Sequence, residues 1–484
     1  MEKKVISSLV WKFSERIIAQ SITLIVSMVL ARRVTVEEYG IVGIVMIAIT
    51  IANVFVSNGI GSALIQKKDA DDLDFSSVFY INFLVSILVY LGIYFFAPFI
   101  SVYFDSSILC PMLRILGIRV IIASINSIQH AYVSKNMLFK KFFYSTLVGT
   151  CVSGIVGITL AYMNYGAWSI VVQYLTNTII DTIVLWFTID WKPKKIFSFD
   201  RARTLISYGW KLLLSGLIDT GYTQIRGIII GHNYSKSDLA FYNQGDKYPQ
   251  LLVININSSI SAVLFPEMSR FQDEKSKVKE ITRKAIQISS YILWPMMFGF
   301  IAIARPFIEL TITERWLPCV PYIQMFCISY GLWPIHTANL QAINALGHSE
   351  VFLKLEIIKK CIGLFSLIMC VNISPKAIAG SMIITGIISS FVNAFPNTKY
   401  LNYSIKEQLF DIMPSIILSG IMCLIIYPIV LLQTSNLIKL ILQIVVGILV
   451  YIIGSIISKQ KAYYYVLGLL NSVKQHQKKA EDFK

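Results

Sequence analysis

Runs of about 20 mainly apolar residues recur along the whole chain, each long enough as a helix to cross a hydrocarbon core of about 30 Å. No polar stretch between them is long enough to form a separate soluble domain. Hydrophobic residues make up 55% of the 484 positions and charged residues only 14%, which leaves too little polar surface for a soluble protein. The sequence therefore predicts an all-α polytopic membrane protein.

The apolar runs and their polar flanks predict about fourteen transmembrane helices. They lie at residues 10–31, 40–63, 76–100, 113–133, 144–163, 167–189, 210–232, 240–264, 285–304, 321–344, 354–372, 378–398, 412–432 and 437–457. Most of the 43 lysines and arginines fall in the segments of one side, which predicts that both termini are cytoplasmic. The net charge of +16 is therefore assigned to membrane orientation, and nucleic acid is not an expected partner.

The spans divide into two related blocks. We expect an N-terminal six-helix lobe (1–189), a basic cytoplasmic connector (190–209), a C-terminal six-helix lobe (210–400), two additional transmembrane helices (401–457) and a basic cytoplasmic tail (458–484). A shift of 200 positions places 35–40 over 235–240, each just after the first span of its block. Because each block has an even number of spans, the repeats are parallel, and the cleft between the lobes is the natural site.

Several short motifs, in their order and spacing, resemble the polysaccharide transporters of the multidrug/oligosaccharidyl-lipid/polysaccharide flippase superfamily. They are 37–40 (EEYG), 208–211 (YGWK), 228–231 (IIIG), 241–249 (FYNQGDKYP), 263–269 (VLFPEMS) and 353–360 (LKLEIIKK). The resemblance extends over about 8–459 and is closest to the subgroup named for colanic-acid and teichuronic-acid export. It implies two pseudo-symmetric six-helix lobes around a central cavity, as in MATE transporters and lipid II flippases.

The same resemblance implies a function. A member of this family is expected to move an undecaprenyl-diphosphate-linked oligosaccharide across the cytoplasmic membrane of a bacterium by alternating access. The product would serve the synthesis of lipopolysaccharide, capsule or exopolysaccharide. The implied partners are the lipid-linked oligosaccharide, membrane lipids and a coupling ion, either proton or sodium. A polysaccharide polymerase and chain-length machinery are compatible further partners.

A diphosphate crosses hydrocarbon only along a polar, cationic pathway, so polar side chains inside the spans are candidate site residues. In the seventh span Asp219, Thr223 and Arg226 share one helix face by their spacing. Arg226 is the candidate diphosphate ligand, since a guanidinium binds oxyanions bidentately. A structural ion pair between Arg226 and Asp219 is the alternative.

Other spans contribute further candidates. The remaining expected substrate-binding residues are Arg16, Gln20, Asn58, Gln129, His130, Asp246 and Lys247. Amide side chains suit sugar hydroxyls, but they also hold membrane helices together, and Arg16 is close enough to its helix end to reach the cytoplasm. Asp181 and Asp219 are candidate sites of ion coupling, with a hydrogen-bonded structural role as the alternative.

Motifs of enzymes are missing from the sequence. It contains no P-loop, no metal-ligand spacing of histidines and no nucleophile elbow, so we expect neither a cofactor nor a catalytic activity. One rival function is an ion-coupled antiporter of small organic solutes, which would favour buried carboxylates over an arginine. Another is a membrane glycosyltransferase or polymerase, which would need acidic residues on long outer loops. A third is a scaffold for a polysaccharide-synthesis complex.

Overall fold

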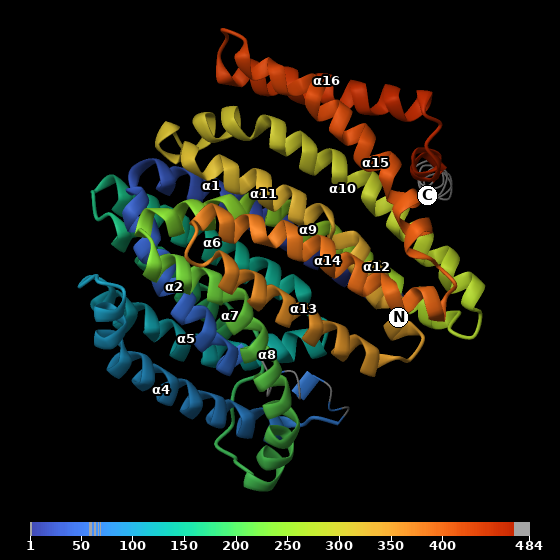
Figure 1. Ribbon diagram of the computed structural model, residues 1–484. Coiled ribbons are helices and arrows are strands. Elements are labelled where there is room, and N and C mark those ends of the chain that lie inside the picture. Colours follow the sequence, from blue (N-terminus) through green and yellow to red (C-terminus); the bar gives the residue numbers. More distant parts are fainter. Residues whose placement is uncertain (1, 58–60, 62–63, 66, 68, 469–484) are drawn as a thin grey trace, which may run out of the picture. The chain divides into compact units, whose positions relative to one another are not determined.

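The computed structural model describes residues 2–57, 61, 64, 65, 67 and 69–468, and every regular element in this part of the chain is helical (Figure 1). The first helices are α1 (Glu2–Arg33), α2 (Val36–Ser57), α4 (Asp72–Tyr103), α5 (Leu109–Lys135), α6 (Phe139–Tyr162), α7 (Ala167–Thr188) and α8 (Phe199–Asn233). They are followed by α9 (Lys236–Arg270), α10 (Lys275–Thr311), α11 (Val320–Gly331), α12 (Trp333–Ala345), α13 (Ser349–Cys370), α14 (Pro375–Tyr400), α15 (Ile405–Ile426) and α16 (Asn436–Ile457). Two 3₁₀ turns, η1 (Glu314–Cys319) and η2 (Tyr427–Leu431), precede α11 and α16.

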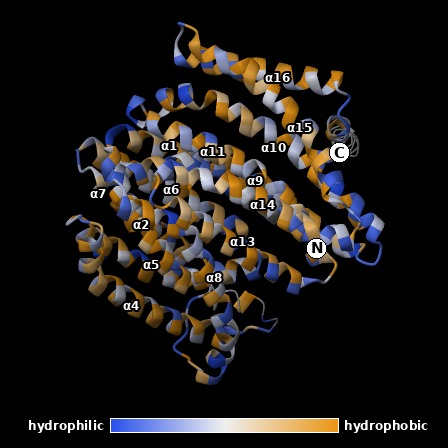
Figure 2. Ribbon diagram, in the orientation of Figure 1, coloured by the Kyte–Doolittle hydropathy of each residue, from blue (hydrophilic) through white to orange (hydrophobic). Residues whose placement is uncertain are grey.

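Eleven of the described helices are long and apolar enough to cross a membrane, so the chain is a multi-pass membrane protein. Figure 2 shows hydrophobic residues running along the helices and hydrophilic residues gathered near the turns. Every predicted span overlaps a described helix, but the count of fourteen is not confirmed. The helices α8 and α13 carry several charges, and the tenth predicted span is divided into α11 and α12. That division lies beside Pro334, which has no amide hydrogen to continue α11.

The contacts divide the chain into two compact units, residues 1–240 and 241–484. In the first unit α1 packs on α6, α6 on α7, and α7 on α5. The helix α5 also contacts α4 and α2, and α8 packs on α2 and α4. The lobe boundaries expected from the sequence stay a prediction.

A row of small residues allows α6 and α7 to approach each other closely. Ser145, Gly149, Ser153 and Gly157 lie four residues apart and therefore on one face of α6. A Cβ atom on Gly157 would lie 2.8 Å from the Cβ of Gln173, which is closer than real contacts allow. Small residues at this spacing are typical of tightly packed membrane helices.

The polar side chains of α7 lie along the same seam. Asn177 donates a hydrogen bond to the Ser153 hydroxyl at 3.3 Å, and Ser145 donates to Asp181 at 2.5 Å. These contacts are about one turn apart along α7 and about two turns apart along α6, so polar groups of α7 are satisfied by the hydroxyls of α6. The seam thus combines close packing with hydrogen bonds.

The segments 35–38 and 235–238, which the shift of 200 positions superposes, start their helices in the same way. The amide of Thr35 donates to Glu38 Oε2 at 3.0 Å, and the amide of Glu38 donates back to Thr35 Oγ1 at 3.3 Å. Ser235 and Asp238 repeat both contacts, at 3.2 Å and 3.0 Å, at the start of α9. Each pair is a reciprocal capping box, which satisfies backbone amides that a helix start leaves unpaired. The local structure therefore follows the proposed internal repeat.

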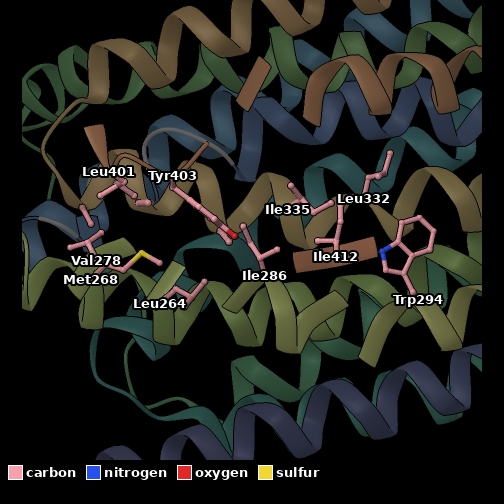
Figure 3. Packing of buried hydrophobic residues seen from close by; sticks show 13 residues of the cluster. Leu264, Met268, Val278, Ile286, Trp294, Leu332, Ile335, Leu401, Tyr403 and Ile412 are labelled. Atoms are coloured by element: carbon pink, nitrogen blue, oxygen red, sulfur yellow. The ribbon is translucent and has the colours of Figure 1, made fainter. Parts of the chain in front are cut away.

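The second unit is built around α10. This helix packs on α11, α12, α15 and α16, so the two additional C-terminal helices lie on its surface. Figure 3 shows the apolar core of this unit, in which Trp294 of α10 and Ile412 of α15 are buried together with residues of α9 and α12.

A polar cluster joins α10 to α15. The carboxylate of Asp411 is 5% exposed and lies 2.7 Å from Nε of Arg283. Gln287 donates to the same carboxylate at 2.6 Å, and the Tyr403 hydroxyl donates to it at 2.7 Å. A carboxylate with this many donors has its charge compensated, which allows it to be buried.

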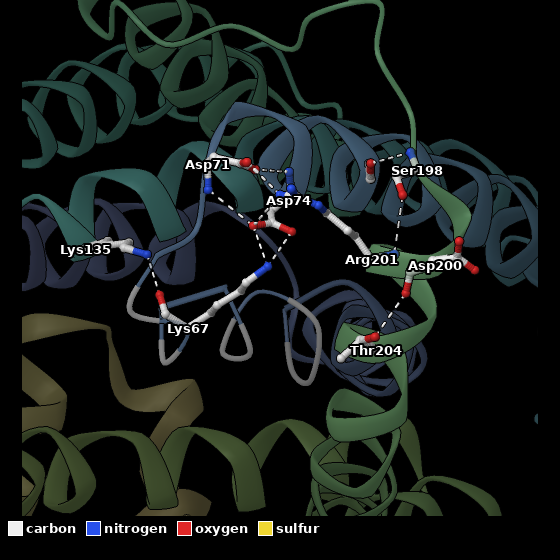
Figure 4. Close-up of polar contacts among 9 residues, drawn as sticks. Lys67, Asp71, Asp74, Lys135, Ser198, Asp200, Arg201 and Thr204 are labelled. Atoms are coloured by element: carbon white, nitrogen blue, oxygen red, sulfur yellow. Dashed lines mark hydrogen bonds and ion pairs between the residues drawn. The ribbon is translucent and has the colours of Figure 1, made fainter.

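The connector after α7 is held against the start of α4 (Figure 4). Arg201 Nη1 lies 2.6 Å from Asp71 Oδ2, and the backbone amide of Asp74 donates to the Asp71 carboxylate at 3.0 Å. These contacts, the backbone one first, lower the pKa of Asp71 from 3.8 to about 2. The side chain of Asp74 is fully buried, and Lys67 Nζ donates to it at 2.6 Å. The connector is therefore an ordered part of the first unit.

Candidate functional site

The face predicted on α8 is present, and its members differ in burial. Arg226 is only 4% exposed, whereas Asp219 and Thr223 are exposed. The guanidinium carbon of Arg226 lies 5.3 Å from the ring centroid of Tyr222, one turn earlier. Nε of Arg226 is buried without a hydrogen-bond partner among the described residues. A buried guanidinium with a free donor is suited to an anion that enters from outside the chain.

The other two members of this face have interactions of their own. Thr223 donates its hydroxyl hydrogen to the carbonyl oxygen of Thr220 at 2.8 Å, a common arrangement for threonine in a helix. Asp219 is also engaged in an interaction. The two roles predicted for Asp219, in substrate binding and in ion coupling, stay predictions.

The candidates of α1 are Arg16 and Gln20. They lie four residues apart on α1, so they share a face. Both are half-buried, and both make interactions. Asn58 lies outside the residues that the structure describes.

A cluster of polar side chains lies where α5, α6 and α7 meet. The carboxylate of Asp181 accepts hydrogen bonds from Asn126 at 2.6 Å and from Ser145 at 2.5 Å. His130 Nε2 lies 3.4 Å from the same carboxylate, and its imidazole is 40% exposed. The ring of His130 also contacts Phe142, with 4.5 Å between the centroids. The structure thus brings together Asp181 and His130, which the sequence offered as separate candidates.

Gln129, the neighbour of His130, points into the protein. It is completely buried, and neither its amide nitrogen nor its amide oxygen has a hydrogen-bond partner among the described residues. Adjacent residues of a helix lie about 100° apart, so His130 and Gln129 cannot share one surface. Of these two candidates, only His130 has an exposed side chain.

Arg119 of α5 is an intramembrane cation that the sequence analysis missed. Its Nε donates to the Thr178 hydroxyl at 2.8 Å, and its guanidinium lies 5.6 Å from the ring centroid of Tyr174. Arg119 is seven residues before Asn126, so both lie on the α5 face that meets α7. The signal was present, because Arg119 lies inside the predicted span 113–133. A polar seam of one cation, one carboxylate and one imidazole therefore runs between α5 and α7.

The candidates of α9 belong to the second unit. Asp246 accepts a hydrogen bond from the hydroxyl of Tyr330 on α11, and both Asp246 and Lys247 are half-buried. Neighbours on a helix lie on different faces, so we expect Lys247 not to share the surface of Asp246. Asp246 therefore faces α11, whereas no hydrogen bond or ion pair of Lys247 is seen with the residues that the structure describes.

A family match identifies the class of this chain. Residues 29–321, more than half of the 484 positions, match the family described as "Polysaccharide biosynthesis protein". The chain belongs to this family. This result confirms the family resemblance that the motifs at 37–40, 208–211 and 241–249 indicated.

Relatives of this polysaccharide biosynthesis protein include a transport protein. The succinoglycan biosynthesis transport protein ExoT of Rhizobium meliloti is 20% identical over 67% of this chain and 65% of that protein. The teichuronic acid biosynthesis protein TuaB of Bacillus subtilis is 24% identical over 62% of each chain. The aligned part is thus slightly under two thirds of the length of either relative.

A solved structure shares the fold almost completely. The lipid II flippase MurJ, in an inward closed conformation, aligns with a TM-score of 0.74 over 94% of this chain and 99% of that chain, at 18% identity. This likeness confirms the expected fold of the lipid II flippase type.

Proposed function

We propose that the protein is a flippase for undecaprenyl-diphosphate-linked oligosaccharide repeat units. It would move them from the cytoplasmic to the outer face of a bacterial cytoplasmic membrane for lipopolysaccharide, capsule or exopolysaccharide synthesis. The observation that carries the proposal is Arg226, a buried guanidinium whose Nε has no hydrogen-bond partner within the described ranges, in a fold shared with a lipid II flippase. Family membership and the names of the relatives agree with it.

In this proposal the chain works by binding and not by catalysis. Arg226 neutralises part of the diphosphate charge, which otherwise makes passage through hydrocarbon prohibitive. Arg16, Gln20, Asn58, Asp219, Thr223, Gln129, His130, Asp246 and Lys247 remain candidates for contacts with the head group. The two lobes alternate access between the two faces, and both termini lie in the cytoplasm.

Ion coupling belongs to the same proposal. The pair Asp181 and His130 can gain or lose a proton or bind a sodium ion, which changes the charge between α5 and α7. Such a pair would also serve an antiporter of small organic solutes, which is the second candidate function. A buried arginine disfavours an organic cation as cargo, so the flippase is preferred.

The test is to count lipid-linked repeat units on each membrane face in cells that lack the protein and express a variant. We expect Arg226→Ala to leave units on the cytoplasmic face and to lower export roughly tenfold or more, since a charge-assisted hydrogen bond contributes about 1.5–3 kcal/mol. Arg226→Lys should retain part of the export, because the charge remains but the bidentate geometry is lost.

Arg203→Ala is the matched control, because Arg203 is an exposed arginine on the same helix. It should export like the wild type. Units that reach the outer face without the protein would contradict the flippase proposal and favour a polymerase or a scaffold. Normal export by Arg226→Ala would contradict the role of this residue.

A further inference from the structure

A second site is suggested by an apolar groove on the first unit. The groove has a volume of about 530 Å³ and lies between α4, α5 and α7. Its walls are mainly aromatic and include Phe79, Tyr80 and Phe83 of α4 and Ile183, Trp186 and Phe187 of α7. The Phe187 side chain is 81% exposed. A groove of this size is within the range of ligand sites.

The groove lies at one end of the membrane-spanning helices. Its α4 residues are in the first turns of that helix and its α7 residues are in the last turns, so it opens near the connector that follows α7. The Tyr80 hydroxyl, on the groove wall, donates to the carbonyl oxygen of Lys194 at 3.0 Å. The amide of Lys194 donates to Ser76 at 3.0 Å, and its Nζ lies 2.6 Å from Asp72. The backbone of the connector is therefore fixed at the end of the groove.

Two exposed cations flank this fixed residue. Lys192 and Lys195 are exposed, and neither forms an ion pair with any residue that the structure describes. The next residues, Ile196 and Phe197, are apolar and 40% and 52% exposed. Basic residues next to exposed apolar ones are typical of segments that lie among lipid head groups.

We propose that the groove binds one acyl chain of an anionic phospholipid, whose phosphate is held by Lys192 and Lys195. The walls around Trp186 give the chain apolar contacts, and the two unpaired ammonium groups give the head group its specificity. A zwitterionic lipid would fill the groove equally well but would gain less from the lysines. The proposal does not depend on what the protein transports.

Trp186 provides the probe for this site. We would reconstitute the full-length protein in phosphatidylcholine vesicles, add phosphatidylglycerol or phosphatidylcholine with brominated acyl chains, and measure tryptophan fluorescence. The difference between the wild type and Trp186→Phe isolates the signal from the groove. We expect brominated phosphatidylglycerol to quench this signal at a roughly tenfold lower mole fraction than brominated phosphatidylcholine.

The lysines are tested by the double variant Lys192→Gln/Lys195→Gln, which should lose the preference for phosphatidylglycerol. The control Lys376→Gln/Lys399→Gln also removes two exposed lysines, at the ends of α14, and should keep the preference. Equal quenching by both lipids, or an unchanged preference in the Lys192/Lys195 variant, would overturn the proposal. Relief of quenching by undecaprenyl diphosphate at lower concentration than by unlabelled phosphatidylglycerol would also overturn it, by assigning the groove to a substrate lipid.

Discussion

At the scale of single residues, the carboxylate of Asp181 has the most informative surroundings. Two other helices supply its neighbours, because Asn126 and His130 come from α5 and Ser145 comes from α6. The sequence identified Asp181 and His130 as ionisable groups inside spans. Their meeting could not be predicted, since it depends on which faces of α5 and α7 pack together.

Asp181→Asn should separate ion coupling from folding. The variant keeps the volume of the side chain and an oxygen that accepts from Ser145, but it loses the charge. We expect the protein to fold and export to lose its dependence on the ion gradient, with a roughly tenfold lower rate. The gradient dependence is measured as the rate of export into vesicles with and without an imposed pH or sodium gradient.

Ser145→Ala is the control for that experiment. It removes one donor to Asp181 and should lower the free energy of unfolding by about 1 kcal/mol while the gradient dependence remains. If Asp181→Asn exports with undiminished gradient dependence, Asp181 has a structural role only.

At the scale of helices, the seam between α6 and α7 determines where Asp181 lies. The four-residue spacing of small side chains on α6 is visible in the sequence, but it does not say which helix packs there. At Gly157 the structure shows that α7 is the helix that packs there, because only a residue without Cβ lets Gln173 of α7 approach so closely. The polar groups of α7 then reach the hydroxyls of Ser145 and Ser153.

Gly157→Val should therefore destabilise the first unit. An added side chain would force α6 and α7 apart, and such overpacking costs about 1–3 kcal/mol. Gly92→Val on α4 is the matched control, because, apart from its chain neighbours and the nearby backbone of α4 itself, no described atom lies within 4 Å of the position of its Cβ. Thermal unfolding in detergent should show a lower Tm for Gly157→Val than for Gly92→Val, and equal values would contradict the close packing of α6 and α7.

At the scale of the whole molecule, the arrangement of spans and the distribution of charge are linked. Basic residues concentrate at 190–211 and after residue 457, which are on one side if all fourteen spans cross the membrane. In the second unit α15 is attached to α10 through Asp411 and its donors, and α16 through the Tyr451 hydroxyl, which donates to the carbonyl oxygen of Tyr291 at 2.9 Å. The fold likeness to MurJ covers 94% of the chain.

Reporter fusions test the predicted orientation. Alkaline phosphatase fused after residue 434, between η2 and α16, should be active because that loop is predicted to lie outside. The same reporter fused after residue 460 should be inactive, and a green fluorescent protein there should fluoresce. The reverse pattern would contradict the cytoplasmic placement of both termini.

The sequence by itself determined the all-helical membrane class, the approximate positions of the helices and the family. Apolar length, helical periodicity and the order of short motifs are local properties, so they can be read without a structure. The tertiary structure decided which intramembrane polar residues meet. It paired Asp181 with His130, placed Arg119 beside Thr178 and left Nε of Arg226 without a hydrogen-bond partner in the part of the chain that the structure describes. Periodicity assigns a residue to a helix face, but only side-chain packing between helices selects the face that it meets.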